Sequence, residues 1–115
     1  MDLINDIQML MEELTLSIKN LRKSGNALAE AEHNYKITLR QEALKLRVED
    51  NLPVTLINQI IYGIPDVAEK RYKRDIAETM YQTNQEHINA TKLKLRLLEA
   101  QLSREWSNTG NESRR

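Results

Sequence analysis

The sequence predicts an all-α fold, a long antiparallel helical hairpin with a short helix at its turn. Charged residues make up 30% of the 115 residues, and the chain has only three Gly, two Pro and one Trp, a composition typical of long helices. Apolar residues recur at intervals of three and four over two long stretches. Between these stretches, residues 51–68 contain both prolines and one glycine, so the chain turns there.

The first predicted helix covers about residues 2–50. Its apolar residues form heptads with two core positions. One position holds Ile7, Leu14, Leu21, Leu28 and Tyr35, and the other holds Ile4, Met11, Ile18, Leu39 and Leu46. Gly25 and Glu32 interrupt the second position. Glycine lowers helix propensity, so Gly25 is compatible with a bend, a break or a close approach of backbones. Because the stripe resumes in register at Leu28, we expect a continuous or mildly kinked helix.

The turn is defined by two prolines and a glycine. Pro53 biases Leu52 away from the helical region, so the first helix has to end before Leu52. We expect Thr55 to be the N-cap of a short helix over about residues 55–62. Gly63 would close that helix in a left-handed conformation, and Pro65 would occupy the first turn of the next helix.

Four aliphatic side chains lie on this short helix: Leu56, Ile57, Ile60 and Ile61. They are candidates for a small recognition tip that contacts a partner. The alternative is a structural cap that closes the hairpin. We favour the cap, because four large aliphatic side chains on so short a helix are stabilised by burial.

The second predicted helix covers about residues 65–107, and we expect the apolar-free tail, residues 108–115, to be disordered. Its stripe consists of Tyr72, Ile76, Met80, His87, Thr91, Leu95, Leu98, Leu102 and Trp106. At about 1.5 Å per residue, each long helix would span roughly 60 Å. A short turn makes the two helices antiparallel, which brings acidic residues near the start of the chain beside basic residues near its end. These are Asp2, Asp6, Glu12 and Glu13 against Lys92, Lys94, Arg96 and Arg104.

Each long helix also carries apolar side chains outside its main stripe. These are Met9 and Leu16 in the first helix and Leu93 and Leu97 in the second. A two-helix hairpin leaves such a second stripe uncovered. We therefore expect a homodimer that forms a four-helix bundle at the terminal end, with these four residues as the candidate dimer interface.

Catalytic and cofactor motifs are absent from the sequence. It contains no nucleotide-binding glycine motif and no nucleophile elbow. His33 and His87 do not have the spacing of a zinc site. We expect no enzyme activity, no catalytic residues, no cofactor and no metal.

The location of the protein is predicted from what the sequence lacks. It has no cysteine and no run of 18 apolar residues, and Asp2 and Asp6 stand where a signal peptide would be basic. These features predict a protein of the cytoplasm that does not associate with a membrane.

The densest basic cluster is Lys70, Arg71, Lys73 and Arg74, a candidate contact for nucleic acid. The same residues are spaced to form i,i+4 ion pairs with acidic neighbours: Glu69 with Lys73, Arg71 with Asp75, and Arg74 with Glu78. Residues 66–78 contain four positive and four negative charges, and the net charge of the chain is zero. We therefore favour a solvated ladder of ion pairs over a phosphate-binding site.

Several blocks of the sequence carry a resemblance to known proteins. They are Ala31-Glu32-His33-Asn34-Tyr35-Lys36, LPVTLI, a YG turn, DVAEKRYKRDIAE and KLKLRLLEAQLSREW. Over most of residues 28–106 the chain resembles small helical proteins encoded in the early regions, for replication and recombination, of tailed phages and prophages of Gram-positive bacteria. The resemblance implies expression early in infection, in the cytoplasm of the host cell. It carries no catalytic or binding residue.

Together these observations predict a non-enzymatic phage protein that acts by protein–protein interaction. The expected partner is a phage or host factor of DNA replication, recombination or defence. Two alternatives remain: an accessory protein that binds nucleic acid through the basic cluster, and a structural assembly protein.

Overall fold

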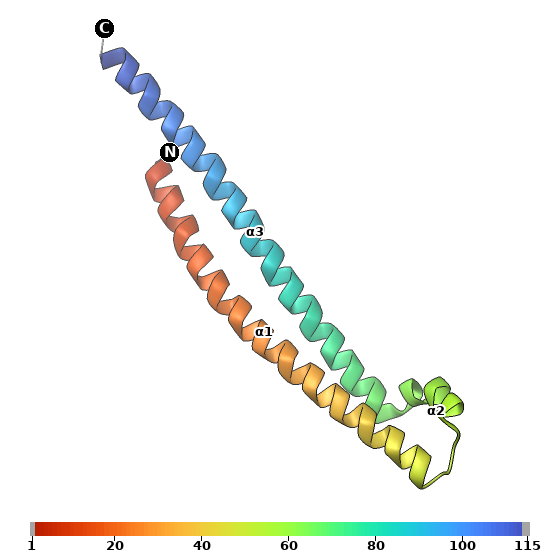
Figure 1. The fold of residues 1–115 in the computed structure, drawn as a ribbon. Helices are drawn as coiled ribbons and strands as arrows, with labels where there is room; N and C mark the ends of the chain where they lie inside the picture. The colour runs from red at the N-terminus through yellow and green to blue at the C-terminus, as the bar shows by residue number, and fades with distance from the viewer. Residues whose placement is uncertain (1, 114–115) are drawn as a thin grey trace. The chain divides into compact units, whose positions relative to one another are not determined.

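A computed structural model describes residues 2–113, and it describes side chains for residues 2–108. This part of the chain is all-α, as predicted. It contains α1 (Leu3–Val48), α2 (Val54–Ile60), the short 3₁₀ helix η1 (Ile61–Gly63) and α3 (Pro65–Ser113) (Figure 1). The order of a long helix, a short helix at the turn and a second long helix is that of the predicted hairpin. Within residues 2–113, no helix has a stretch both long and apolar enough to cross a bilayer.

Helix α1 passes through Gly25 without interruption. A Cβ atom placed on Gly25 would lie 3.3 Å from Cε2 of Tyr81. Of the three roles that the sequence left open for Gly25, the structure shows a close approach, here of the α1 backbone to a side chain of α3.

Helix α2 starts earlier than predicted. Its N-cap is Pro53, with φ −68° and ψ 150°, and no side chain caps it. The backbone N–H groups of Leu56 and Ile57 both donate to the Pro53 carbonyl, at 3.1 Å. The prediction of Thr55 as the N-cap is therefore wrong. The fixed φ of proline already sets the extended conformation that an N-cap requires.

The left-handed residue of the turn is Asn51, with φ 53°, and not Gly63. After η1 the chain leaves through Ile64 in an extended conformation, φ −65° and ψ 128°, which suits a residue that precedes proline. The sharp reversal instead follows α1. There the Leu52 N–H donates to the Leu46 carbonyl at 3.2 Å, and Arg47 Nη1 donates to the Leu52 carbonyl at 2.9 Å. Asparagine tolerates the left-handed region better than most residues, which explains Asn51 here.

Helix α3 begins at Pro65, as predicted, with Asp66 in its first turn. It extends to Ser113, beyond the predicted end at about residue 107. The remainder of the predicted disordered tail, residues 114–115, lies outside the described residues.

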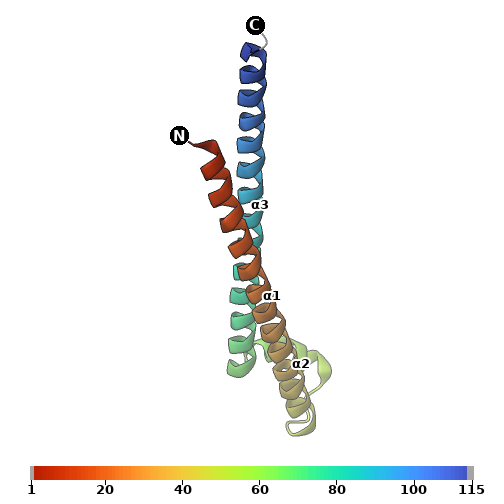
Figure 2. The same cartoon turned by 90° about the vertical axis from the view of Figure 1, so that its left-hand side faces the viewer.

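The chain divides into two compact units. The terminal unit joins the first 22 residues to the segment from residue 83 onward, and the turn unit comprises residues 23–82. In each unit a segment of α1 lies beside an antiparallel segment of α3, and in the turn unit α2 lies where α1 ends and α3 starts (Figures 1 and 2).

The core of the turn unit consists of Tyr35, Ile57, Ile61 and Val67, all buried. Partly buried apolar side chains pack around it: Leu39, Ala43, Leu46, Leu52 and Ile64. Val67 is fully buried. Two side chains from α2 and η1 thus fix the short helix against α1 and the first turns of α3.

The core of the terminal unit mixes apolar and small polar residues. Leu3, Ile88 and Leu95 are buried together with Ser17 and Thr91. The Thr91 hydroxyl donates to the His87 carbonyl at 2.9 Å, so its polar group is satisfied within α3. No buried side-chain polar atom of the described residues lacks a hydrogen-bond partner.

One heptad position of the α1 stripe is correct in the turn unit, where Leu39 and Leu46 pack against the core, but differs from the prediction over the first part of α1. The first core position holds Ile7, Leu14 and Leu21. The buried residues at the second core position are Leu3, Ser17 and Ser24. The residues predicted for that position, Ile4, Met11 and Ile18, are about half exposed. Each predicted residue lies one position after the true core position. Small serine side chains let two helices approach closely, which a pattern of hydrophobicity alone does not reveal.

The α3 stripe is correct only in its second half. Thr91 and Leu95 face the core, but Tyr72, Ile76 and Met80 are 63%, 46% and 57% exposed. A spacing of four residues advances about 40° past a full turn, so a run of such steps drifts away from the core. Trp106, at the other end of the predicted stripe, is 69% exposed.

Candidate interaction surface

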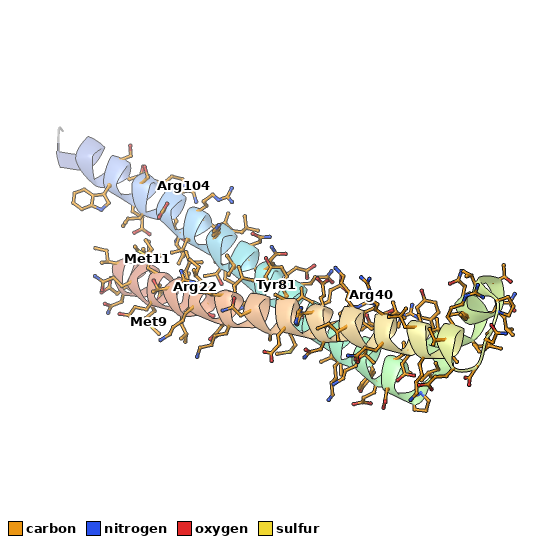
Figure 3. The ribbon with its side chains drawn as sticks, turned by 60° about the horizontal axis from the view of Figure 1, so that its bottom comes forward. Met9, Met11, Arg22, Arg40, Tyr81 and Arg104 are labelled. Carbon is orange, nitrogen blue, oxygen red and sulfur yellow. The ribbon has the colours of Figure 1, made fainter. Side chains whose placement is uncertain are left out.

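The four residues predicted for a dimer interface all lie in the terminal unit, and all are exposed. Met9 is 66% exposed, Leu16 58%, Leu93 53% and Leu97 61%. Figure 3 shows Met9 pointing away from the body of α1, on a different side of the helix from Met11. Large aliphatic side chains this exposed are surface that a monomer leaves in water.

Two shallow apolar hollows adjoin these residues. The first, of about 480 Å³, is lined by Met9 and Leu10 with Asp6, Glu13 and Leu98. The second, of about 270 Å³, is lined by Leu97 and Leu98 with Leu10, Lys94 and Gln101. Leu10 and Leu98 line both hollows, so these two leucines face each other across the seam between α1 and α3.

Helical geometry places the exposed residues on one flank of the pair. Met9 precedes Leu10, and Leu97 precedes Leu98, by about 100° of rotation. The two-fold rotation that exchanges antiparallel helices carries Leu10 onto Leu98, and it carries Met9 onto Leu97. Leu16 lies two turns after Met9, and Leu93 one turn before Leu97, so both extend the same flank. We call Met9, Leu16, Leu93 and Leu97 the terminal face.

Charges of opposite sign lie within the terminal face, along the seam between α1 and α3. Asp6 and Glu13 lie on its α1 side, and Lys94 lies on its α3 side. Glu13 Oε1 is 3.2 Å from His87 Nε2. An acidic residue of α1 thus contacts α3 near this face. The apolar side chains of the terminal face therefore lie on either side of a seam that carries acidic residues on α1 and a basic residue on α3.

The predicted tip residues divide into two pairs. Ile57 and Ile61 are 6% and 4% exposed and belong to the core. Leu56 and Ile60 are 38% and 40% exposed. The short helix is thus mainly a cap, in line with the favoured interpretation, and only Leu56 and Ile60 remain available to a partner.

The basic cluster is largely engaged within the turn unit. Arg74 Nη2 is 2.7 Å from Asp75 Oδ1, and the Arg74 guanidinium lies 4.7 Å from the centre of the Tyr35 ring. The hydrogen bond to the Asp75 carboxylate raises the pKa of Arg74, so the guanidinium stays charged. The side chain is only 26% exposed. Arg74 is therefore a structural residue of the turn unit.

The other basic residues of the cluster have partners as well, apart from the partly buried Lys70. Arg71 lies over the Tyr62 ring at 5.1 Å, and Lys73 Nζ is 3.7 Å from Glu69 Oε1. The Glu69–Lys73 pair is a rung of the predicted i,i+4 ladder, whereas Asp75 pairs with its neighbour Arg74. These contacts use charge that a phosphate-binding surface would present to its ligand.

The described residues contain no group of three or more His, Asp or Glu side chains placed to hold a metal ion. One histidine, His87, contacts the single carboxylate of Glu13. A pair of this kind provides two ligands, where a structural zinc site uses four.

Comparison of the chain with protein-family models, curated proteins and solved structures finds no match. The functional proposal therefore rests on the surfaces of the molecule.

One surface was not predicted from the sequence. A hollow of about 270 Å³ lies in the turn unit between α1, α2 and η1, lined by Lys36, Leu39, Arg40, Ala43, Ile57, Asn58, Ile61 and Tyr62. The only sequence signal for it is the pair of cations at i and i+4, Lys36 and Arg40, flanking Leu39. The hollow depends on where α2 packs, which the sequence pattern does not specify.

Proposed function

We propose that the protein is a non-enzymatic interaction protein that forms a homodimer through the terminal face. One observation carries this proposal: four aliphatic side chains on one flank of the terminal unit are each more than half exposed. Burial of such a side chain contributes about 1.5–3 kcal/mol relative to full exposure. A second copy covers this flank and turns two helices into four, a common way for antiparallel helix pairs to complete a core.

The charges along the seam of the terminal face support a second copy as the occupant. In a dimer with two-fold symmetry, a patch on one protomer meets the same patch on the other, and each contact occurs twice. When the α1 side of one protomer meets the α3 side of its partner, Asp6 and Glu13 come near Lys94. Opposite charges facing each other across the contact favour this arrangement over one that places like charges together.

We further propose that the dimer binds a phage or host protein of DNA replication, recombination or defence. This part of the proposal rests on the resemblance to early phage proteins. The engagement of Arg71, Lys73 and Arg74 within the turn unit favours a protein partner over nucleic acid.

The oligomeric state tests the interface. Molar mass is measured by size-exclusion chromatography with light scattering for the wild-type protein and for Leu93→Glu/Leu97→Glu. We expect a dimer and a monomer, respectively. The matched control is Ile4→Glu/Met11→Glu, two residues of similar exposure outside the terminal face, and it should remain dimeric. A monomeric wild type, or a dimer that only the control disrupts, contradicts the proposed interface. Assemblies larger than a dimer would instead favour a structural assembly protein.

The partner is tested by capture. The tagged protein is used to isolate partners from lysate of infected host cells, with and without nuclease, and bound proteins are identified by mass spectrometry. A stoichiometric partner that survives nuclease and is a factor of DNA metabolism or defence supports the proposal. Association that disappears with nuclease contradicts it and favours direct binding of nucleic acid.

A further inference from the structure

The hollow of the turn unit combines an apolar floor with a cationic rim. Leu39, Ala43, Ile57 and Ile61 supply apolar side chains, and the two isoleucines are buried. Lys36 and Arg40 lie on the rim one helical turn apart, and both are exposed. No acidic residue lines the hollow. Its electrostatic character is therefore positive on one side and neutral elsewhere.

The rim cations differ from those of the basic cluster. Within residues 2–108, Lys36 and Arg40 have no ion-pair partner and no contact with an aromatic ring, whereas Arg71 and Arg74 each lie over a tyrosine. Tyr62, which lines the hollow, is the ring beneath Arg71. A third cation therefore stands near the edge of the hollow. The charge on Lys36 and Arg40 is available to a ligand without breaking a contact of the protein.

The size of the hollow limits what it can hold. Sites for drug-sized ligands and cofactors enclose about 300–1,000 Å³. The hollow, at about 270 Å³ and open to solvent, has room for one or two apolar side chains. Side chains at i and i+4 of a helix are about 5–6 Å apart at Cβ, a distance that two carboxylates of one peptide can match.

We infer that this hollow binds an acidic peptide segment of a partner protein, with a bulky apolar side chain inserted against Leu39 and Ile57 and with carboxylates paired to Lys36 and Arg40. This inference deepens the proposed function, since it gives the chemistry of the protein partner. The binding site lies wholly within the turn unit and involves none of the terminal face. Each site can therefore be disrupted separately.

Selection from a phage-displayed library of random peptides tests the inference. The wild-type protein is the target, and the selected peptides are then synthesised with a fluorescent label for measurement of Kd by anisotropy. We expect the selected peptides to share Asp or Glu residues around one large apolar residue. Lys36→Glu/Arg40→Glu should weaken their binding at least about tenfold, or about 1.4 kcal/mol. Raising the salt from about 0.05 M to about 0.5 M should also weaken it.

The matched control is Lys92→Glu/Arg96→Glu, which makes the same charge change on an exposed Lys and Arg one helical turn apart in α3, outside the hollow. It should bind the peptides as the wild type does. All four substituted residues are exposed, and circular dichroism checks that each variant keeps its helices. A library that yields no binding peptide, peptides without acidic residues, or equal loss of affinity in both double variants would overturn the inference.

Two further measurements separate the outcomes. A labelled single-stranded oligonucleotide that binds the wild type but not Lys36→Glu/Arg40→Glu, when no peptide is selected, would assign the hollow to nucleic acid and overturn the inference. The molar mass of the same variant is measured in parallel. Because Lys36 and Arg40 lie outside the terminal face, the variant should stay dimeric. Loss of peptide binding in an intact dimer thus concerns the hollow alone, and loss of the dimer in Leu93→Glu/Leu97→Glu concerns the proposed interface alone.

Discussion

Replacement of Ile57 by alanine tests whether the short helix is a cap or an exposed tip. Ile57 is 6% exposed, and the substitution removes three carbons, each worth about 0.8 kcal/mol when buried. The loss of burial therefore amounts to about 2.3 kcal/mol, and the cavity left in the core brings the expected cost to about 3 kcal/mol. Ile60, three residues later in α2, provides a matched control.

Ile60 is 40% exposed, so the same substitution there removes less buried surface. Scaled by its buried fraction, the expected cost is about 1.4 kcal/mol, and water fills the space, so no cavity remains. The better helix propensity of alanine offsets a few tenths of a kcal/mol at both positions. The two variants should therefore differ by about 1.5 kcal/mol or more.

Hydrogen exchange measured by mass spectrometry reports this difference locally. The free energy of opening of residues 53–64 is obtained from their protection factors, with peptides from the terminal unit as an internal reference. Ile57→Ala should lower protection about a hundredfold, since each 1.4 kcal/mol is a factor of ten. Ile60→Ala should lower it about tenfold. Equal losses, or a larger loss for Ile60→Ala, would refute the assignment of Ile57 to the core.

Three other substitutions test the backbone and the basic cluster, each by thermal or urea denaturation followed by circular dichroism. Gly25→Leu should destabilise the fold by about 1–3 kcal/mol because even a Cβ would meet the Tyr81 ring at 3.3 Å; no loss would mean that the two helices do not approach there. Asn51→Val should cost about 1–2 kcal/mol because of its positive φ, while Asn51→Gly should cost nothing, and the reverse order would contradict the left-handed conformation. Arg74→Gln should cost about 1 kcal/mol through its lost ring contact and ion pair, and Lys73→Gln, in an exposed pair, less than about 0.5 kcal/mol. Equal effects of the last two would argue against a structural role for Arg74.

The helices and the turn were accessible from the sequence because prolines and long apolar periodicities leave few alternatives. Pro53 and Pro65 mark the ends correctly, since a missing N–H and a fixed φ act locally. The details of the turn were not accessible. Thr55 has the preferred chemistry for an N-cap, but Pro53 is the N-cap of α2. Gly63 was expected to be left-handed, but the left-handed residue is Asn51, which follows α1 and does not close the short helix.

The register of α1 shows a second limit. Ile4, Met11 and Ile18 are more apolar than Leu3, Ser17 and Ser24 taken together, so hydrophobicity selects the wrong heptad position. The choice depends on the distance between the helices, and serine is favoured where that distance is short. The exposure of Met9 and Leu16 could be predicted, since these residues lie outside the stripe in either register.

The surfaces differ in the same way. The terminal face follows from positions along single helices, which a sequence shows directly. The hollow of the turn unit requires Lys36 and Arg40 from α1 to adjoin Ile57 and Ile61 from a different element. No local pattern contains that relation, so only the three-dimensional structure reveals it.

The division into two units also bears on how the chain reaches its fold. Ile57 and Val67 of the turn unit are near neighbours in sequence, whereas Leu10 and Leu98 of the terminal unit come from opposite ends of the chain. The entropy lost on loop closure increases with loop length, so the turn unit can assemble first and shorten the loop that remains to be closed. During synthesis, Leu10 leaves the ribosome long before its partner Leu98 is made. The nascent chain therefore exposes this apolar stripe of α1 until α3 is made, the stage at which chaperones bind and aggregation begins.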